Sequence, residues 1–286
     1  MKIAELYKTG KPVVSFEVFP PKKGLGISGI YPALEETAAL KPDFISVTYG
    51  AGGGGNVNRT AEIAHRIQTE HNIPALAHLT CLGSNITQIG ELLGQMRERG
   101  IENVLALRGD EPESGETVSD GYRFAEELIR DVHARGDFCI GAACYPEGHI
   151  DCDSLDLDTV HLRRKQEAGA DFLITQLFFD NDLFLRFLER ARKGGVTLPI
   201  SAGVMPILSQ QQISRMIFLC GASLPSNIIR LLHKHEKSPD DLFRAGIEFA
   251  ARQMEQLLAQ GVDGIHIYTM NKPQIARYCM KHIGRM

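Results

Sequence analysis

The stretch Val13-Val14-Ser15-Phe16-Glu17-Val18-Phe19-Pro20-Pro21 is the first apolar run of the chain. Its valines and phenylalanines favour an extended backbone, and the Pro-Pro pair ends that extension because proline has no amide hydrogen to donate. A nearly continuous apolar run is typical of a parallel strand that is covered on both faces. We therefore expect a buried parallel strand over Val13–Phe19.

Similar runs recur along the whole chain and alternate with segments of helical periodicity. The expected strands are Val13–Phe19, Phe44–Tyr49, Ala75–Cys81, Val104–Arg108, Phe138–Tyr145, Phe172–Phe179, Ile200–Met205 and Ile265–Met270. Alternating strands and helices in this number predict an α/β fold, a (β/α)8 TIM barrel that forms a single domain over residues 1–286. A doubly wound sheet with eight strands is the alternative.

Apolar residues at helical spacing mark the connecting helices. The expected buried positions are Ile86, Ile89, Leu93 and Met96 before Gly100, then Phe124, Leu128, Ile129 and Val132, then Leu183, Phe184, Phe187, Leu188 and Ala191 before Gly194. Glycine after such a pattern is a common helix stop. Two or more helices fit between the seventh and eighth strands, and the last of them stops at Gly261.

Composition excludes several classes of protein. The chain has 286 residues, 43% hydrophobic and 23% charged, with a formal net charge of −4 and no dense basic run. We therefore expect no nucleic-acid partner and no membrane partner. No apolar stretch could span a bilayer and the first residues lack a signal-peptide core, so a soluble cytoplasmic protein is expected. The six cysteines are scattered without a C-x-x-C pair, which predicts buried apolar side chains and no metal site.

Glu17 is the unusual residue of the first strand because a carboxylate in an apolar strand is costly without a partner or a task. Burial disfavours the ionised form of a carboxyl group, and a general acid must be protonated near neutral pH. The sequence therefore suggests a general acid, and a carboxylate satisfied by a structural partner is the alternative.

Polar residues also follow most of the other strands. They are Thr48, Tyr49, His78, Arg108, Gly109, Asp110, Tyr145, His149, Gln176, His266 and Tyr268. The carboxyl ends of the strands form the active-site face of such barrels, so these residues predict a site for a large polar ligand. The Arg-Gly-Asp triplet is either a salt-bridged turn or an anion-binding arginine beside an orienting carboxylate.

Two further segments permit more than one interpretation. The glycine-rich segment 50–55 matches G-x-G-x-x-G, but the next strand does not end in the acidic residue that a dinucleotide fold requires. We expect a loop over the barrel mouth instead. Asp158, His161, Arg164 and Lys165 recur at helical spacing and predict a solvated helix face, which would also suit phosphate binding if the helix borders the mouth.

Several blocks of the sequence resemble the methylenetetrahydrofolate reductase family. The blocks occur in family order over nearly the whole chain: Ser15–Pro21, Ser46–Ala51, His78–Cys81, Ala106–Asp110, Tyr145–His149 and Ile174–Gln176. The resemblance implies a flavin-bearing (β/α)8 barrel of the length of the bacterial catalytic unit. It implies reduction of 5,10-methylenetetrahydrofolate to 5-methyltetrahydrofolate by ping-pong hydride transfer from NADH or NADPH through FAD.

The resemblance also implies roles for individual residues. Glu17 corresponds to the general acid, and Asp110 to the acidic residue beside flavin and folate. The implied folate-binding residues are Gln176, Thr48, Tyr268 and Lys272. The implied FAD-binding residues are Tyr49, Ala51, His78, Leu107, Arg108, Gly109, Asp110, Tyr122, Ala143, Tyr145, His149, Asp158, His161, Arg164 and Lys165.

Three positions depart from the best-known bacterial pattern. His161 stands where the family has asparagine, Leu232 where an aromatic residue is expected, and Lys272 where an arginine is expected. They leave the electron donor open: NADH, NADPH or a partner subunit that transfers electrons. A homo-oligomer is expected. The alternatives are another flavin barrel oxidoreductase, such as a proline dehydrogenase, or a flavin-free folate-binding subunit.

Overall fold

The structure is a computed structural model that describes residues 1–21, 24–49, 57–110, 120–136 and 138–286. Eight parallel strands form one closed barrel in the order of the sequence. They are β1 (Val13–Val18), β2 (Phe44–Val47), β3 (Ala75–Thr80), β4 (Asn103–Leu107), β5 (Cys139–Cys144), β6 (Phe172–Thr175), β7 (Ile200–Val204) and β8 (Gly264–Tyr268). Because β1 pairs with β8, the barrel prediction is confirmed and the doubly wound sheet is wrong.

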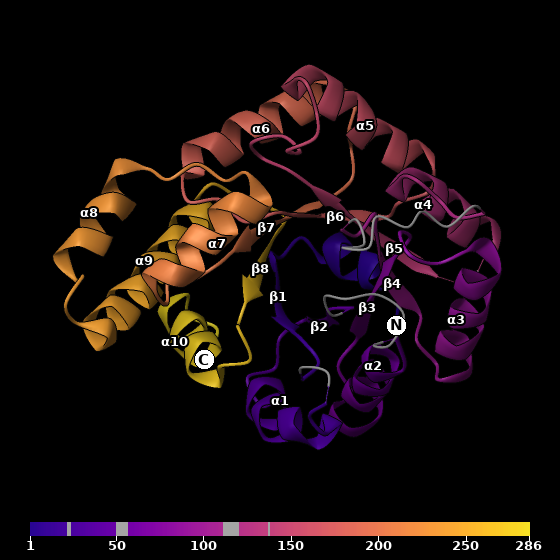
Figure 1. Ribbon diagram of the computed structural model, residues 1–286, viewed down its shortest axis with the longest axis horizontal. Coiled ribbons are helices and arrows are strands. Elements are labelled where there is room, and N and C mark those ends of the chain that lie inside the picture. The colour runs from indigo at the N-terminus through magenta and orange to yellow at the C-terminus, as the bar shows by residue number, and fades with distance from the viewer. Residues whose placement is uncertain (22–23, 50–56, 111–119, 137) are drawn as a thin grey trace.

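Helices surround the barrel on its outside (Figure 1). The α-helices are α1 (Tyr31–Ala38), α2 (Val57–His71), α3 (Ile86–Glu98), α4 (Ala125–Ala134), α5 (Leu155–Glu167), α6 (Asn181–Lys193), α7 (Gln210–Cys220), α8 (Ser226–Lys234), α9 (Pro239–Ala259) and α10 (Pro273–His282). Two 3₁₀ segments, η1 (Ile3–Thr9) and η2 (Ile27–Ile30), complete the order. Helices α7, α8 and α9 follow β7, and α8 lies farthest from the barrel axis in Figure 1.

The strands end earlier than the apolar runs predicted. The clearest case is β6, which ends at Thr175 instead of Phe179. Phe178 and Phe179 are nonetheless buried, since they pack among the outer helices after leaving the sheet. An apolar run therefore marked burial correctly but could not distinguish the end of a strand from a buried loop.

The first residue of two helix faces that were predicted to be buried is exposed instead. Ile86 is 46% exposed and Phe124, which precedes α4, is 55% exposed. The first residue of a barrel helix lies at the rim, beyond the sheet that the rest of the helix covers. The later positions, including Ile89 in α3 and Leu128 in α4, are fully buried as expected.

The closed sheet determines which residues point into the barrel. Side chains alternate along a strand, and the register pairs Glu17 with Ser46 and with Tyr268. The residues of this parity in β1, Val13, Ser15 and Glu17, therefore run along the inside from the amino-terminal end toward the mouth. The alternate residues of β1, such as Phe16 and Val18, point outward and pack against the helices.

Segment η1 closes the amino-terminal end of the barrel. Ile3 is fully buried, and its amide donates to Asn103 Oδ1 at 2.8 Å. The Tyr7 hydroxyl lies 2.8 Å from Ser201 Oγ, and its ring packs 5.6 Å from Phe172. Sequence analysis did not predict this plug, because a short 3₁₀ segment has no distinctive periodicity.

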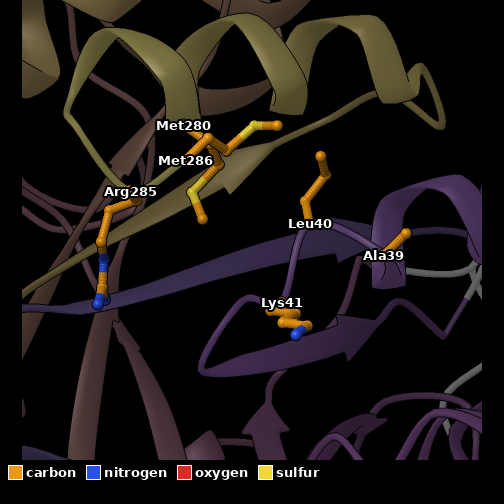
Figure 2. A pocket seen from close by; sticks show the side chains of 6 residues that line it. All are labelled: Ala39, Leu40, Lys41, Met280, Arg285 and Met286. Atoms are coloured by element: carbon orange, nitrogen blue, oxygen red, sulfur yellow. The ribbon is translucent and has the colours of Figure 1, made fainter.

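Two cavities among the described residues lie away from the carboxyl ends of the strands. One, of about 310 Å³, lies where the loop after α1 meets the chain end, with Met280 and Met286 facing Leu40 (Figure 2). The other, of about 550 Å³, lies between α5 and α6. Neither is lined by a residue of the predicted site.

Candidate functional site

Glu17 lies at the barrel mouth between two histidines. Its Oε2 is 3.6 Å from His78 Nε2 and 3.7 Å from His266 Nε2. The Glu17 side chain is 18% exposed, whereas the side chains of His78 and His266 are 8% and 1% exposed. The expectation of a half-buried carboxylate at the end of β1 is confirmed. The histidines come from β3 and β8, so only closure of the sheet brings them together.

His78 is held in the neutral state by its surroundings. Burial lowers its pKa to about 4, and the opposing effect of Glu17 is smaller. Its Nε2 is buried and has no hydrogen-bond partner among the residues that the structure describes. A buried polar atom without a partner is unusual, and here it is aimed at the carboxylate. His78 Nε2 therefore keeps its hydrogen-bonding capacity beside Glu17 at the mouth.

His266 has polar neighbours at both ring nitrogens. Nδ1 lies 2.7 Å from Ser15 Oγ, and Nε2 lies 3.3 Å from Ser46 Oγ. The Phe44 ring stacks on the imidazole at 6.0 Å. The sequence predicts His266 only as a polar group at a strand end and does not single out the two serines, although their inward-facing positions in the strands were a usable signal.

Tyr268 and Gln176 form the side of the mouth opposite the third strand. Tyr268 donates its hydroxyl to the Thr175 carbonyl at 2.8 Å, and burial raises its pKa well above the ordinary value. A Cβ on Gly203 would lie 2.7 Å from that hydroxyl, so this position requires glycine. The Gln176 side chain accepts the Leu177 amide at 2.8 Å. The amide nitrogen of Gln176 therefore keeps its donor capacity for another group.

The Arg108-Gly109-Asp110 turn does not pair with itself. Arg108 Nη1 donates to Asp151 Oδ2 at 3.0 Å, in the loop after β5. Gly109 has φ of 83°, and a Cβ there would lie 2.9 Å from Thr80 Cβ. Asp110 is exposed at the mouth. Arg108 thus has a carboxylate partner in Asp151, and both interpretations of the triplet, the salt-bridged turn and the anion-binding arginine, stay predictions.

The predicted solvated face of α5 is wrong for two of its four residues. Asp158 is buried and accepts the His149 amide at 3.3 Å. Lys165 donates to the Ala143 carbonyl at 2.8 Å, and burial lowers its pKa. The two residues are seven positions apart, so they share one side of the helix, which faces the end of β5. Arg164 is exposed, since one position turns a side chain by about 100°.

Two aromatic side chains, those of Tyr145 and His149, lie beside α5. Tyr145 meets His149 edge to face at 4.7 Å, and Lys165 Nζ lies 5.6 Å from the Tyr145 ring centre. Burial lowers the pKa of His149 and raises that of Tyr145. The structure therefore brings Ala143, Tyr145, His149, Asp158 and Lys165 into one cluster, as expected for residues of a common site.

Other predicted residues lie farther round the rim. Tyr49 is buried, while the Thr48 carbonyl accepts the Thr60 hydroxyl at 2.9 Å. Tyr122 packs beside α4, where burial raises its pKa to about 12 and Asp131 adds to the effect. Lys272 is exposed, with its amine 5.7 Å from the Phe243 ring centre.

The remaining predicted positions add little to this geometry. Leu107 packs on the inner apolar cluster of the barrel, and His161 is half-buried on α5. Leu232, on α8, packs on the apolar cluster that contains Ile228. Ala51 and the other residues of the glycine-rich loop lie outside the described residues.

The part of the chain that the structure describes shows neither a metal site nor a membrane-spanning helix. No group of three or more His, Cys, Asp or Glu side chains there could hold a metal ion. All six cysteines are free, and Cys81, Cys139, Cys144 and Cys279 are buried, as expected. None of the helices in the described ranges is long and apolar enough to cross a membrane.

Sequence comparison relates the chain to folate enzymes. The family model for methylenetetrahydrofolate reductase matches residues 2–284. A probable methylenetetrahydrofolate reductase (NADH) of Oryza sativa is 34% identical and aligns with 99% of this chain and 50% of its own length. A 5,10-methylenetetrahydrofolate reductase of Pectobacterium carotovorum is 32% identical over 98% of this chain and 92% of its own. The chain thus spans about half the length of the plant relatives.

Structural comparison agrees with the barrel. An uncharacterised Clostridium thermocellum protein that binds two copies of 5-methyl-5,6,7,8-tetrahydrofolic acid superimposes with a TM-score of 0.69 at 16% identity, covering 98% of both chains. A Coxiella burnetii dihydropteroate synthase in complex with pteroic acid gives a TM-score of 0.54 at 10% identity, covering 96% and 94%. Identities this low show a shared fold.

Proposed function

This chain belongs to the methylenetetrahydrofolate reductase family, and from that premise we propose that it reduces 5,10-methylenetetrahydrofolate to 5-methyltetrahydrofolate. The observation that carries the proposal is the carboxyl group of Glu17, set between His78 and His266 at the carboxyl end of the barrel. This is the face where barrels of this class carry their active sites. The family match supports the reaction, and the position of Glu17 supports its role as the proton donor.

We propose FAD as the cofactor and NADH or NADPH as the electron donor. The residues present fit a large planar cofactor. Gly109 packs its backbone closely on Thr80 at the end of β4, and His78 Nε2 has no hydrogen-bond partner among the described residues. Lys165 and Arg164 add positive charge on α5 beside this region, which suits phosphate groups. When bound, FAD would accept a hydride from the nicotinamide and pass it to the folate.

The remaining assignments give each polar group a task. Glu17 would protonate the folate nitrogen that leaves the bridging methylene group, which opens the five-membered ring to a reactive iminium. Asp110, exposed at the mouth, would stabilise positive charge on the substrate and tune the cofactor. Gln176 and Thr48 would bind the pterin, with Tyr268 and Lys272 at the edge. The FAD-binding set would be that named from the sequence, including Tyr49, Ala51 and Tyr122.

The proposal has two versions, which differ in the source of the electrons. In the simpler version the reduced nicotinamide binds first, leaves, and is replaced by folate at the same face, in ping-pong order. In the other version a partner subunit delivers the electrons, and the chain still reduces the folate. A homo-oligomer is proposed for either version.

The test is a pair of separated half-reactions. Purified protein is saturated with FAD, titrated anaerobically with NADH and with NADPH, and then mixed with methylenetetrahydrofolate. We expect loss of the oxidised flavin absorbance with one nucleotide and its return with the folate. If dithionite-reduced flavin is reoxidised by the folate but neither nucleotide reduces it, electrons come from a partner. If the chain binds no flavin, or its reduced flavin does not react with the folate, the proposal is wrong.

A further inference from the structure

The imidazole of His266 is fixed in one orientation inside the barrel. The residue is 1% exposed, and Phe44 stacks on it while Tyr268 meets it edge-on at 5.4 Å. Ser15 Oγ lies 2.7 Å from Nδ1, and Ser46 Oγ lies 3.3 Å from Nε2. A ring held this tightly presents Nε2 in one direction, and that direction leads to Glu17 Oε2 at 3.7 Å.

The hydrogen bonds of Ser15 determine the tautomer. Its single hydroxyl hydrogen has a backbone acceptor, the Ile265 carbonyl, at 3.3 Å. When Ser15 donates there, its oxygen can accept a hydrogen from His266 Nδ1, which lies 2.7 Å away. In a neutral imidazole only one nitrogen carries hydrogen, so Nε2 is left with a lone pair. That lone pair can accept from the Ser46 hydroxyl or from a protonated Glu17.

We propose that His266 is a positioning residue that presents Nε2 as a hydrogen-bond acceptor to the carboxyl group of Glu17, with Ser15 fixing the tautomer. The inference rests on the proposed function. The 3.7 Å separation is longer than a hydrogen bond. Catalytic contacts are often long without substrate and close in the complex, directly or through a water molecule.

The other groups that face Glu17 agree with an uncharged environment. His78 approaches from β3, and burial lowers its pKa to about 4. Tyr268 lies on β8 beside Glu17, and burial raises its pKa well above the ordinary value. Ser46 on β2 is neutral at any pH. His78, Tyr268 and Ser46 therefore add no formal charge beside Glu17.

The proton balance of the step is simple. The Glu17 carboxyl proton moves to the departing folate nitrogen, whose bond to the bridging methylene carbon breaks with its electron pair going to that nitrogen. Glu17 is left as a carboxylate and regains a proton from solvent. His266 neither gains nor loses a proton, because its Nε2 only accepts a hydrogen bond.

The pH profile of the folate half-reaction tests this assignment. His266→Asn keeps a polar atom near Ser15 but removes the group at Nε2, and Ser15→Ala releases the tautomer. With reduced flavin mixed against methylenetetrahydrofolate, we expect both variants to move the half-maximal rate to lower pH by about one unit, equal to about tenfold in the proton affinity of the acid. Rates on the alkaline side should fall by a similar factor. Flavin reduction by nicotinamide should not change.

Ser201→Ala is the matched control, because it removes another buried hydroxyl inside the barrel, bonded to Tyr7 instead of His266. It should give the parent profile. A shift to higher pH in His266→Asn would show that His266 carries a charge, and an unshifted profile would show a structural role alone. Either result overturns the inference.

Nitrogen NMR of protein labelled at histidine gives a second measurement that needs no turnover. The His266 signal, assigned by its loss in His266→Asn, should show hydrogen on Nδ1 only, and Ser15→Ala should shift the tautomer balance. Hydrogen on Nε2, or on both nitrogens, in the parent protein would refute the inference. If the tautomer is as expected but the parent protein does not reduce the folate, the proposed function fails and not this assignment of the proton.

Discussion

At the scale of the residue, the central feature is a carboxyl group that faces two imidazoles across a closed barrel. Glu17, His78 and His266 come from three strands, and their closest atoms are 3.6 and 3.7 Å apart. The low pKa of His78 means that burial, and not the attraction of the carboxylate, decides its charge. His78 therefore faces Glu17 as a neutral imidazole.

Replacing Glu17 with Gln should slow folate reduction by about 100-fold or more, the usual contribution of a general acid. Reduction of the flavin by nicotinamide should be nearly unchanged, because the amide has the same shape and no proton transfer is needed there. Stopped-flow measurement of each half-reaction separates the two. Glu167→Gln, at an exposed position paired with Arg163, is the control. Equal loss in both half-reactions would contradict an acid role.

His78 should also make the fold sensitive to acid. Its pKa is about 4 in the folded protein against 6.5 in the unfolded chain, so the unfolded state binds the proton more readily. The free energy of unfolding should therefore fall as pH drops from 6.5 towards 4, with a slope from this residue of up to about 1.4 kcal/mol per pH unit. His78→Gln should reduce that slope in urea titrations at several pH values. An identical slope in the variant would contradict the assignment.

Among the secondary-structure elements, α5 carries charged residues on two different sides. Asp158 and Lys165 face the end of β5 and are enclosed, whereas Arg164 faces solvent. The same sequence period describes all four polar residues of the helix, so periodicity alone could not separate them.

This division predicts different salt dependence for FAD binding. Lys165→Met should weaken FAD affinity by about tenfold at low and at high salt, because a shielded cation is little screened. Arg164→Gln should weaken it by about threefold at low salt only, as expected for an exposed charge. Fluorescence titration of FAD at two ionic strengths measures both. Unchanged affinity in both variants would remove α5 from the FAD site.

Helix α9 packs so closely on the loop after β7 that it requires a glycine. A Cβ on Gly246 would overlap the Ile207 carbonyl oxygen, so Gly246→Ala should destabilise the protein by about 3 kcal/mol. A Cβ on Gly94, in α3, would meet no described heavy atom within 4 Å, and Gly94→Ala should instead stabilise by up to about 1 kcal/mol. Denaturant titrations of the pair test the packing, and a neutral Gly246→Ala would contradict it.

In the molecule as a whole, η1 closes one end of the barrel and the proposed site lies at the other end. Segment η1 fills the amino-terminal end, and Asn103 holds it by accepting the Ile3 amide and donating to the Met1 and Ala75 carbonyls. The carboxyl end carries Glu17 and its histidines. The buried polar contacts of η1 and the proposed site therefore lie at opposite ends of the barrel.

Asn103→Ala should accordingly destabilise the fold by about 3 kcal/mol, since it leaves several buried backbone groups without partners. Both half-reactions should keep their rates at temperatures where the variant is folded. Thermal unfolding and stopped-flow kinetics provide the two measurements. A loss of folate reduction without a loss of stability would show that the two ends of the barrel are coupled.

The barrel class, the order of its strands and the polar strand ends where a site could lie are predictable from the amino-acid sequence. The hydrophobic period is a local property: an apolar run such as Val13–Phe19 predicts a mostly buried segment, but it does not fix the residue at which the strand ends. The sequence also identified Glu17 as anomalous, because an acid in such a run is costly in any fold.

Only the tertiary structure decided which polar groups meet. His266 is 249 residues from Glu17 in sequence (266 − 17), yet closure of β8 onto β1 brings it to 3.7 Å. The plug η1, the inward turn of Lys165 and the end of β6 at Thr175 likewise depend on neighbours that are distant in the chain. Local pattern fixes the face of a strand, whereas the register of a closed sheet fixes the partner across it.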